Sequence, residues 1–187
     1  MQLIFSGDFK LNESVDEDLC QRLVGRWLPS VRLPSTAGGI VDLAAPSTGR
    51  TVIYCYPRTS EPGKPAPTDW DLIQGARGCT PQACTFRDHY QELRALGAEV
   101  FGLSTQTTAY QAEMSGRLHL PFAVLSDRAM RVTNALRLPT FMVDGMRLIK
   151  RLTIIARGPR IETVFYPIVR PEENASDVIA WLKANPI

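Results

Sequence analysis

The 187-residue sequence predicts an α/β fold with a mixed central β-sheet flanked by helices. Segments rich in β-branched and aromatic residues alternate with segments of helical apolar spacing: 51–57, 80–96, 98–105, 108–118, 122–127 and 129–137. A hairpin over 152–166, turning at Gly158-Pro159, and a C-terminal amphipathic helix then follow. Strands that alternate with helices and end in a hairpin indicate parallel and antiparallel pairs in one sheet.

The remaining segments are expected to lie at the periphery of this core. Residues 14–28 predict a short helix, so 1–28 are interpreted as an N-terminal extension and 29–187 as the main domain. Val41 to Leu43 predict an edge strand. Residues 58–76, dense in proline and glycine, predict a surface loop inserted after the strand that ends at Pro57.

Composition and charge exclude several classes of partner. The net charge of +2 and the scattered Lys and Arg residues do not indicate a nucleic-acid partner. No apolar run approaches the ~20 residues of a membrane helix, and the first residues do not read as a signal peptide. We therefore expect a cytoplasmic protein without a membrane partner. In a reducing compartment, the four cysteines indicate reactive or buried thiols more than a disulfide framework.

The stretch GCTPQAC concentrates the chemistry. Cys79 stands at the entrance of the predicted helix, with Thr80 as the expected N-cap and Pro81 at the first helical position. Unpaired N–H groups and the helix dipole favour negative charge there, so more of the thiol is in the reactive thiolate form. Arg77 and Arg87 could add positive potential. Cys79 is thus a candidate nucleophile.

The second cysteine of this stretch, Cys84, lies too far along the helix to pair with Cys79. Five helical residues rise ~7.5 Å, whereas bridged cysteines need Cα atoms roughly 4.4–6.8 Å apart. A Cys79–Cys84 disulfide therefore predicts that the first turns of the helix unwind on oxidation.

The segments TVIYCYP, GCTPQACTFRDHY, VFGLST, VLSD and KRLTIIARGPRI, in this order, resemble the peroxiredoxins, most closely the Q or bacterioferritin-comigratory type. The resemblance implies a thioredoxin-like fold and a thiol-dependent peroxidase without a cofactor. It implies that Cys79 attacks hydrogen peroxide or an organic hydroperoxide and becomes a sulfenic acid. Cys84 would then resolve it as an intramolecular disulfide. A thioredoxin or glutaredoxin-like protein would be the reductant.

The resemblance also assigns supporting residues. Arg151 matches the arginine that orients thiolate and peroxide, where a fixed cation stabilises the departing oxygen. Pro57 matches the proline that shields the site from water. Ala76 replaces the hydroxyl residue of the family motif, so Thr59 or Ser60 is expected to supply the missing hydroxyl. The resemblance leaves the oligomeric state open between monomer and homodimer.

Other interpretations compete with the peroxidase. The cysteine pair could be two buried hydrophobes. A zinc site of Cys79, Cys84 and His89 fails on ligand count, so no metal site is predicted. Pro139-Thr140 resembles the cis-proline turn of thioredoxins, which keeps a thiol–disulfide oxidoreductase as an alternative. A non-enzymatic redox sensor is the other.

The two remaining cysteines are given no catalytic role. Cys55 is expected to pack in the core, within the strand TVIYCYP. Cys20 is expected to be an incidental and accessible thiol of the N-terminal segment.

Overall fold

The computed structural model describes residues 7–45 and 47–187, with side chains in the first helix from Ser14 onward. Its elements, in chain order, are α1 (Gly7–Gln21), β1 (Arg32–Pro34), β2 (Ile40–Asp42), β3 (Arg50–Cys55), the 3₁₀ turn η1 (Trp70–Leu72), α2 (Cys79–Asp88), α3 (Tyr90–Ala95), β4 (Ala98–Ser104), α4 (Thr108–Arg117), β5 (Val124–Ser126), α5 (Arg131–Leu136), β6 (Thr140–Val143), β7 (Met146–Ile149), β8 (Leu152–Arg157), β9 (Arg160–Phe165) and α6 (Asn174–Ala184).

Five strands form the central sheet in the order β5-β4-β3-β8-β9. β3 is parallel to β4, and β4 is parallel to β5, whereas β8 is antiparallel to both β3 and β9. The sheet is therefore mixed, which confirms the predicted fold class. All of β3 is buried, because helices or strands cover it on every side.

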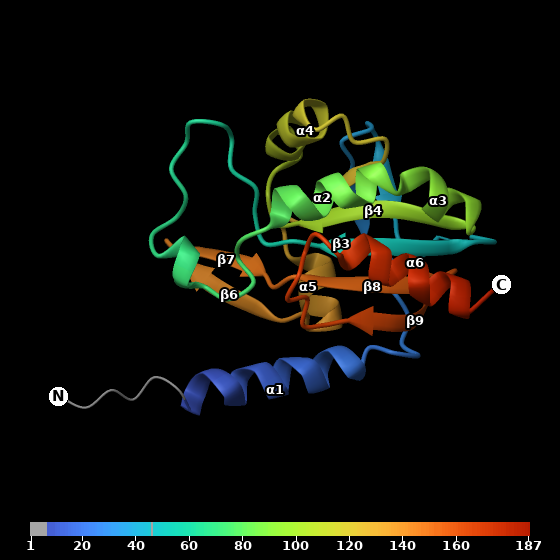
Figure 1. Cartoon of the computed structure of the whole chain (residues 1–187), viewed down its shortest axis with the longest axis horizontal. Coiled ribbons are helices and arrows are strands. Elements are labelled where there is room, and N and C mark those ends of the chain that lie inside the picture. Colours follow the sequence, from blue (N-terminus) through green and yellow to red (C-terminus); the bar gives the residue numbers. More distant parts are fainter. Residues whose placement is uncertain (1–6, 46) are drawn as a thin grey trace.

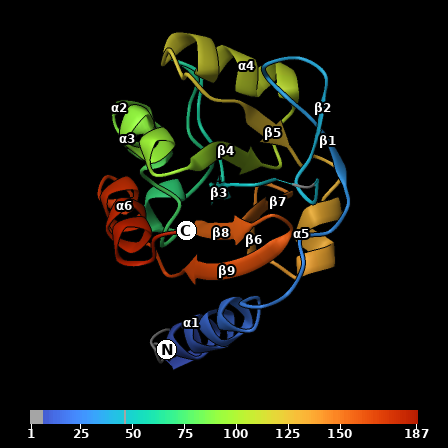
Figure 2. The same ribbon diagram turned by 90° about the vertical axis from the view of Figure 1, so that its right-hand side faces the viewer.

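Helices cover both faces of this sheet. Figure 2 shows α2, α3 and α6 on one face, with α5 and the small β1–β2 sheet on the other. Packing explains the first layer: Phe86 of α2 stacks on Tyr54 of β3 with ring centroids 4.6 Å apart. Val178 and Leu182 of α6 are buried in the same cluster. α1 runs along the β9 edge of the sheet (Figure 1).

The structure differs from the sequence predictions in several places, among them the N-terminal helix, which is predicted over 14–28 and found at Gly7–Gln21. The helix expected over 80–96 is interrupted at His89, whose φ of −96° and ψ of 7° end α2 and begin α3. β2 pairs only with β1, in a separate two-stranded sheet, and is not an edge of the main one. The β6–β7 hairpin was not predicted. Its turn, Asp144-Gly145, has positive φ at both residues, the conformation that an Asp-Gly pair favours in hairpins.

The N-terminal segment is joined to the core more closely than expected. Cys20 and Leu23 are buried at 0% and 2% exposure within one core cluster, so the expectation of an accessible Cys20 is wrong. Burial raises the pKa of the Cys20 thiol to about 12. Asp16 of α1 also accepts from Lys150 Nζ at 2.6 Å. The domain boundary between residues 28 and 29 stays a prediction.

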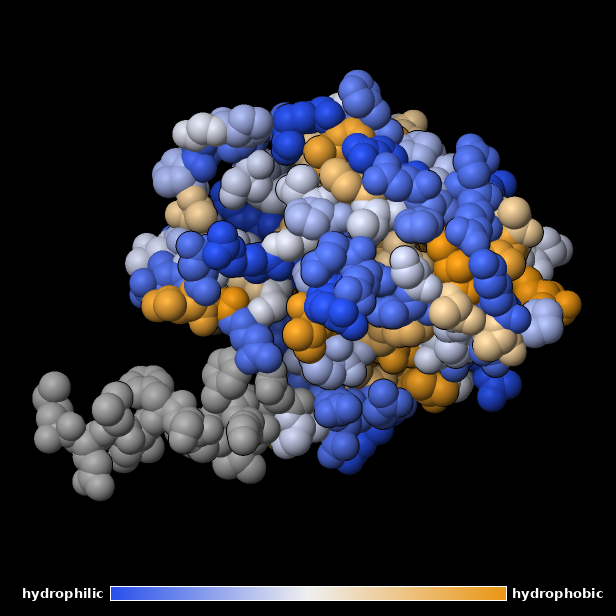
Figure 3. Space-filling model, viewed as in Figure 1, coloured by the Kyte–Doolittle hydropathy of each residue, from blue (hydrophilic) through white to orange (hydrophobic). Residues whose placement is uncertain are grey.

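The face of the molecule that is turned to the viewer in Figure 1 is mainly hydrophilic, with apolar patches between polar side chains (Figure 3). None of the helices in the described part of the chain is long and apolar enough to cross a membrane.

Candidate active site

The start of α2 depends on a glycine. Gly78 is the N-cap residue with φ 95°, and Cys79 is the first residue of the helix. Thr80 is therefore not the N-cap, and Pro81 lies inside the first turn. A proline is tolerated there because the first turn's N–H groups have no helical acceptor. The left-handed backbone at Gly78 turns the chain so that the Cys79 thiol enters the protein, where it is 5% exposed.

We expect Gly78→Ala to destabilise the protein by about 3 kcal/mol. A Cβ at this position would lie 2.7 Å from Pro171 Cγ in addition to straining a positive φ. Urea denaturation measures the loss. Gly75→Ala is the matched control, because Gly75 has φ 76° but nothing within 4 Å of its Cβ position. It should cost only about 1 kcal/mol, and equal losses in both variants would contradict the predicted contact.

Arg151 places a cation against the Cys79 sulfur. Its Nη2 lies 3.2 Å from Cys79 Sγ and also donates to the carbonyl of Arg77 at 2.7 Å. The carbonyls of Gly75 and Ala76 lie 3.2 and 3.4 Å from the same nitrogen. The guanidinium is 3% exposed, so solvent screens its charge little. A cation at this distance can stabilise negative charge that develops in the site.

Three buried polar residues position this arginine, and sequence reasoning missed all of them. Arg151 Nη1 donates to Gln82 Oε1. Gln82 Nε2 donates to Asn174 Oδ1 at 2.9 Å, and Thr153 Oγ1 donates to the same oxygen at 2.7 Å. Gln82, Asn174 and Thr153 are all 0% exposed. Gln82 stands inside GCTPQAC, so the stretch holds the cation as well as the two thiols. A polar residue on the buried face of an amphipathic helix was the signal available.

Cys84 lies in the same intact helix, and all four cysteines are free thiols. It is partly exposed, unlike Cys79. Arg87 lies close to Cys84. The pKa of Arg87 is raised mainly by its hydrogen bond to Asp88, and the nearby Cys84 raises it further. The structure therefore keeps the two thiols apart in α2 and does not pair them.

The residues before the insertion are held away from solvent. Pro57 is buried, and Thr59 is 3% exposed. The Thr59 N–H and hydroxyl donate to Gln106 Oε1 at 3.0 and 3.3 Å, and Gln106 Nε2 donates back to the Thr59 carbonyl at 3.0 Å. The Thr59 hydroxyl is thus engaged by Gln106, and its role toward peroxide stays a prediction. Ala76 is fully buried, and its carbonyl lies 3.5 Å from Cys79 Sγ.

Other residues considered from the sequence lie outside this cluster. The Arg77 side chain is 72% exposed and pairs with Asp71 at 3.2 Å, so only its carbonyl reaches the site. His89 contacts Glu92 at 3.6 Å on the helix flank. Cys55 is 0% exposed in β3, which confirms its packing role, and burial raises the pKa of its thiol. The bond before Pro139 is not cis, so the resemblance of that turn to a thioredoxin cis-proline turn lacks support.

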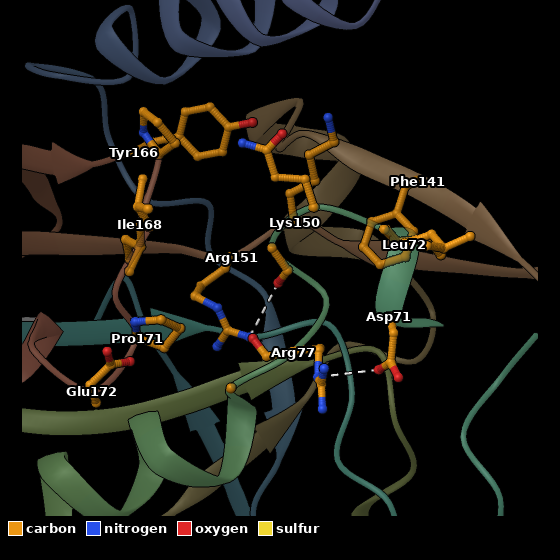
Figure 4. Close-up of a pocket in the computed structure, with 16 residues that line it drawn as sticks. Asp71, Leu72, Arg77, Phe141, Lys150, Arg151, Tyr166, Ile168, Pro171 and Glu172 are labelled. Atoms are coloured by element: carbon orange, nitrogen blue, oxygen red, sulfur yellow. Dashed lines mark hydrogen bonds and ion pairs between the residues drawn. The ribbon is translucent and has the colours of Figure 1, made fainter. Parts of the chain in front are cut away.

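A pocket of about 590 Å³ opens beside Arg151 and Gly78 (Figure 4). Figure 4 shows Arg151 between side chains of the 166–172 segment and side chains of the 71–77 segment. The walls of the pocket are largely apolar and include Phe141, Ile168 and Val169. Cys79 itself does not line the pocket, but Arg151 lines it and also contacts the Cys79 sulfur.

The fold and the site together define a class of mixed α/β proteins with a buried cysteine at a helix start and an arginine on its sulfur. The chain belongs to the Redoxin family, whose model matches residues 23–179.

Similar proteins within this family are named as peroxiredoxins. The chloroplastic peroxiredoxin Q of Arabidopsis thaliana is 26% identical over 160 residues, which cover 86% of this chain and 67% of the relative. A putative bcp peroxiredoxin of Coxiella burnetii is 26% identical over 165 residues, covering 85% of this chain and 97% of the relative. The chain thus spans about two thirds of the length of the plant protein.

A solved structure shows the same fold. The peroxidoxin BcpB of Mycobacterium tuberculosis has a TM-score of 0.71 at 23% identity and covers 88% of this chain and 98% of its own. Together these comparisons confirm the resemblance to the Q and bcp peroxiredoxins and, with it, the prediction of an enzyme of the peroxidase class.

Proposed function

We propose that the protein reduces hydroperoxides through a sulfenic acid at Cys79 and an intramolecular Cys79–Cys84 disulfide. The observation that carries this proposal is the 3.2 Å contact between Arg151 Nη2 and the sulfur of Cys79. A buried thiol with a fixed cation on its sulfur is suited to attack on a peroxide, because both the thiolate and the leaving oxygen are anionic.

In the first step, the Cys79 thiolate attacks the terminal oxygen of the hydroperoxide. A sulfur–oxygen bond forms, the oxygen–oxygen bond breaks, and the electron pair stays on the departing alkoxide or hydroxide. Arg151 stabilises this developing charge. Protonation then gives water or an alcohol as product and leaves the sulfenic acid on Cys79.

In the second step, the Cys84 thiol displaces water from the sulfenic acid and a disulfide forms. Because both residues lie in α2, its first turns must unwind before the sulfurs meet. Gln82 lies between them and bonds both Arg151 and Asn174. Unwinding would release these two hydrogen bonds, so the arginine network favours the wound, reduced state.

The pocket beside Arg151 supports a role for organic hydroperoxides as well as hydrogen peroxide. Apolar side chains such as Phe141 and Ile168 would contact the organic part of a substrate, while Arg151 faces its peroxide group. A thioredoxin-type or glutaredoxin-like dithiol would reduce the disulfide and complete the cycle. We place this cycle in the cytoplasm.

Peroxide consumption coupled to a thioredoxin system or to dithiothreitol tests the proposal. Sustained turnover supports it. A thiol–disulfide oxidoreductase would instead reduce insulin disulfides and leave peroxide untouched, and a sensor would react once with peroxide without efficient recycling. Either result would contradict the proposed peroxidase function and support the corresponding alternative.

Cys84→Ser is expected to stop thioredoxin-dependent turnover while leaving one equivalent of peroxide reduced per Cys79. The first step needs no second thiol, whereas the disulfide substrate of thioredoxin cannot form without Cys84. Mass spectrometry of the peroxide-treated variant should show added oxygen on Cys79 and no intramolecular bridge. Unchanged thioredoxin-dependent turnover would show that another thiol resolves the sulfenic acid.

Oxidation of the parent protein should accelerate amide hydrogen exchange over residues 79–86. The expected cause is loss of the first turns of α2 when the bridge forms. Peroxide-treated Cys84→Ser is the control, because it is oxidised without a bridge and should keep its protection. Full protection of 79–86 in bridged protein would contradict the unwinding step.

A further inference from the structure

A second pocket, of about 500 Å³, lies outside the site described above and shares none of its lining residues. Three arginines line it: Arg58, Arg128 and Arg147. Arg58 directly follows Pro57, Arg128 lies between β5 and α5, and Arg147 belongs to β7. No acidic residue is among the residues that line it. The tertiary structure therefore gathers three positive charges from distant segments at one hollow.

These charges are not neutralised within the described part of the chain. None of the three arginines forms an ion pair there. The Arg58 Nη1 donates to the Met146 sulfur at 3.2 Å, a weak acceptor, and its guanidinium lies 5.8 Å from the centre of the Tyr110 ring. The Arg58 Nε is buried and has no acceptor among the residues that the structure describes. A buried cationic donor without a partner costs free energy that an anionic acceptor would recover.

Hydrogen bonds to neutral side chains hold Arg147, the second arginine of this pocket, in place. Arg147 Nε donates to Thr140 Oγ1 and Nη1 to Asn134 Oδ1, both at 3.1 Å. These acceptors orient the guanidinium without neutralising it. Asp127, which precedes Arg128 in the chain, does not line this pocket, and its carboxylate accepts from Val132 N at 3.2 Å and from Thr133 N at 2.8 Å. The pocket is thus preorganised for an anion.

We propose that this pocket binds a small molecule that carries a phosphate group. Arginine is suited to this ligand, because its planar donors match two phosphate oxygens at once. Thr105, Thr107 and Gln106 add neutral polar groups, and the volume leaves room for an organic part against Met130 and Leu148. Arg58 directly follows Pro57 and lines the pocket, so the ligand would contact the segment that carries Pro57, which Gln106 also holds through Thr59.

The test titrates reduced, ¹⁵N-labelled protein with inorganic phosphate and with pyrophosphate, at ionic strength balanced by sodium chloride. We expect saturable shifts of the Arg58 Nε–H signal and of the Gln106 amide. Arg147→Gln should weaken binding about tenfold or more, since it removes a charged donor. Arg157→Gln, a change at an exposed arginine outside the pocket, should leave affinity unchanged.

Shifts that grow linearly without saturation, or equal affinity in the parent and Arg147→Gln, would overturn the proposal. Tighter binding of citrate than of either phosphate would overturn the assignment to phosphate. Thermal midpoints report whether Arg147→Gln is folded. If it is not, Arg128→Gln, at an exposed loop position, provides the same comparison with the same expected loss.

Discussion

Cys79→Ser is expected to lower kcat/KM for hydrogen peroxide by at least about a thousandfold, since removal of a nucleophile removes the reaction path itself. A serine hydroxyl is not ionised beside Arg151 as a thiolate would be, and it does not attack a peroxide oxygen. The thioredoxin-coupled assay measures this loss. The substitution changes one small buried side chain, so the thermal midpoint should remain close to that of the parent.

Cys20→Ala is the matched control for this experiment. Cys20 is also buried, but it lies in the core cluster that contains Cys55 and not in the cluster of Cys79. The high pKa of Cys20, about 12, keeps its thiol protonated near neutrality. If Cys20→Ala is fully active and Cys79→Ser is inactive, peroxide reduction requires the Cys79 thiol in particular. Comparable activity of Cys79→Ser and parent would exclude Cys79 as the nucleophile.

Arg151→Met is expected to reduce kcat/KM by about a hundredfold or more, the cost of removing a preorganised donor from a developing negative charge. The variant also loses the guanidinium that lies 3.2 Å from the Cys79 sulfur and stabilises negative charge on it as it attacks. Iodoacetamide should therefore alkylate Cys79 more slowly at pH 7, which a purely structural role would not require. Arg151→Lys should fall between the two proteins, because it keeps the charge but loses the forked contacts with Gln82 and Arg77.

Arg157→Met supplies the control within the same strand, since Arg157 ends β8 at an exposed position. It should retain parent activity and alkylation rate. Arg151→Met leaves buried acceptors unpaired, so part of any loss could come from unfolding. Circular dichroism separates the two causes. A folded Arg151→Met with parent alkylation and turnover rates would remove the arginine from the mechanism.

Periodicity in the sequence predicted most of the central fold correctly. The strands from β3 to β5 and the β8–β9 hairpin have strong local patterns, because a buried strand must be continuously apolar and a hairpin needs a turn such as Gly158-Pro159. The errors arose where local signals were weak. The break at His89 interrupts an apolar pattern that continues through it, and the burial of Cys20 depends on how α1 packs along β9.

The residues of the candidate site were likewise predicted only in part. Cys79 was predicted from its place at a helix start, whereas the roles of Cys84 and Arg151 came from the family resemblance. The structure places Arg151 on the Cys79 sulfur across 72 residues of chain. The buried partners of the arginine were not predicted. Gln82, Thr153 and Asn174 come from three elements, and no local pattern shows that their side chains meet.

By itself, the sequence determined the α/β order of elements, the two thiols at their five-residue spacing and the resemblance to the Q-type peroxiredoxins. The order of elements and the thiol spacing are properties of neighbouring residues, so local physical chemistry is enough to predict them, whereas the resemblance depends on motifs shared with a known family. Only the tertiary structure decided what surrounds the thiol: Gly78 as its cap, Pro171 behind that cap and the network that holds Arg151. It also brought Arg58, Arg128 and Arg147 to one pocket. Such contacts join residues far apart in the chain, and their free energy exists only once the core has packed.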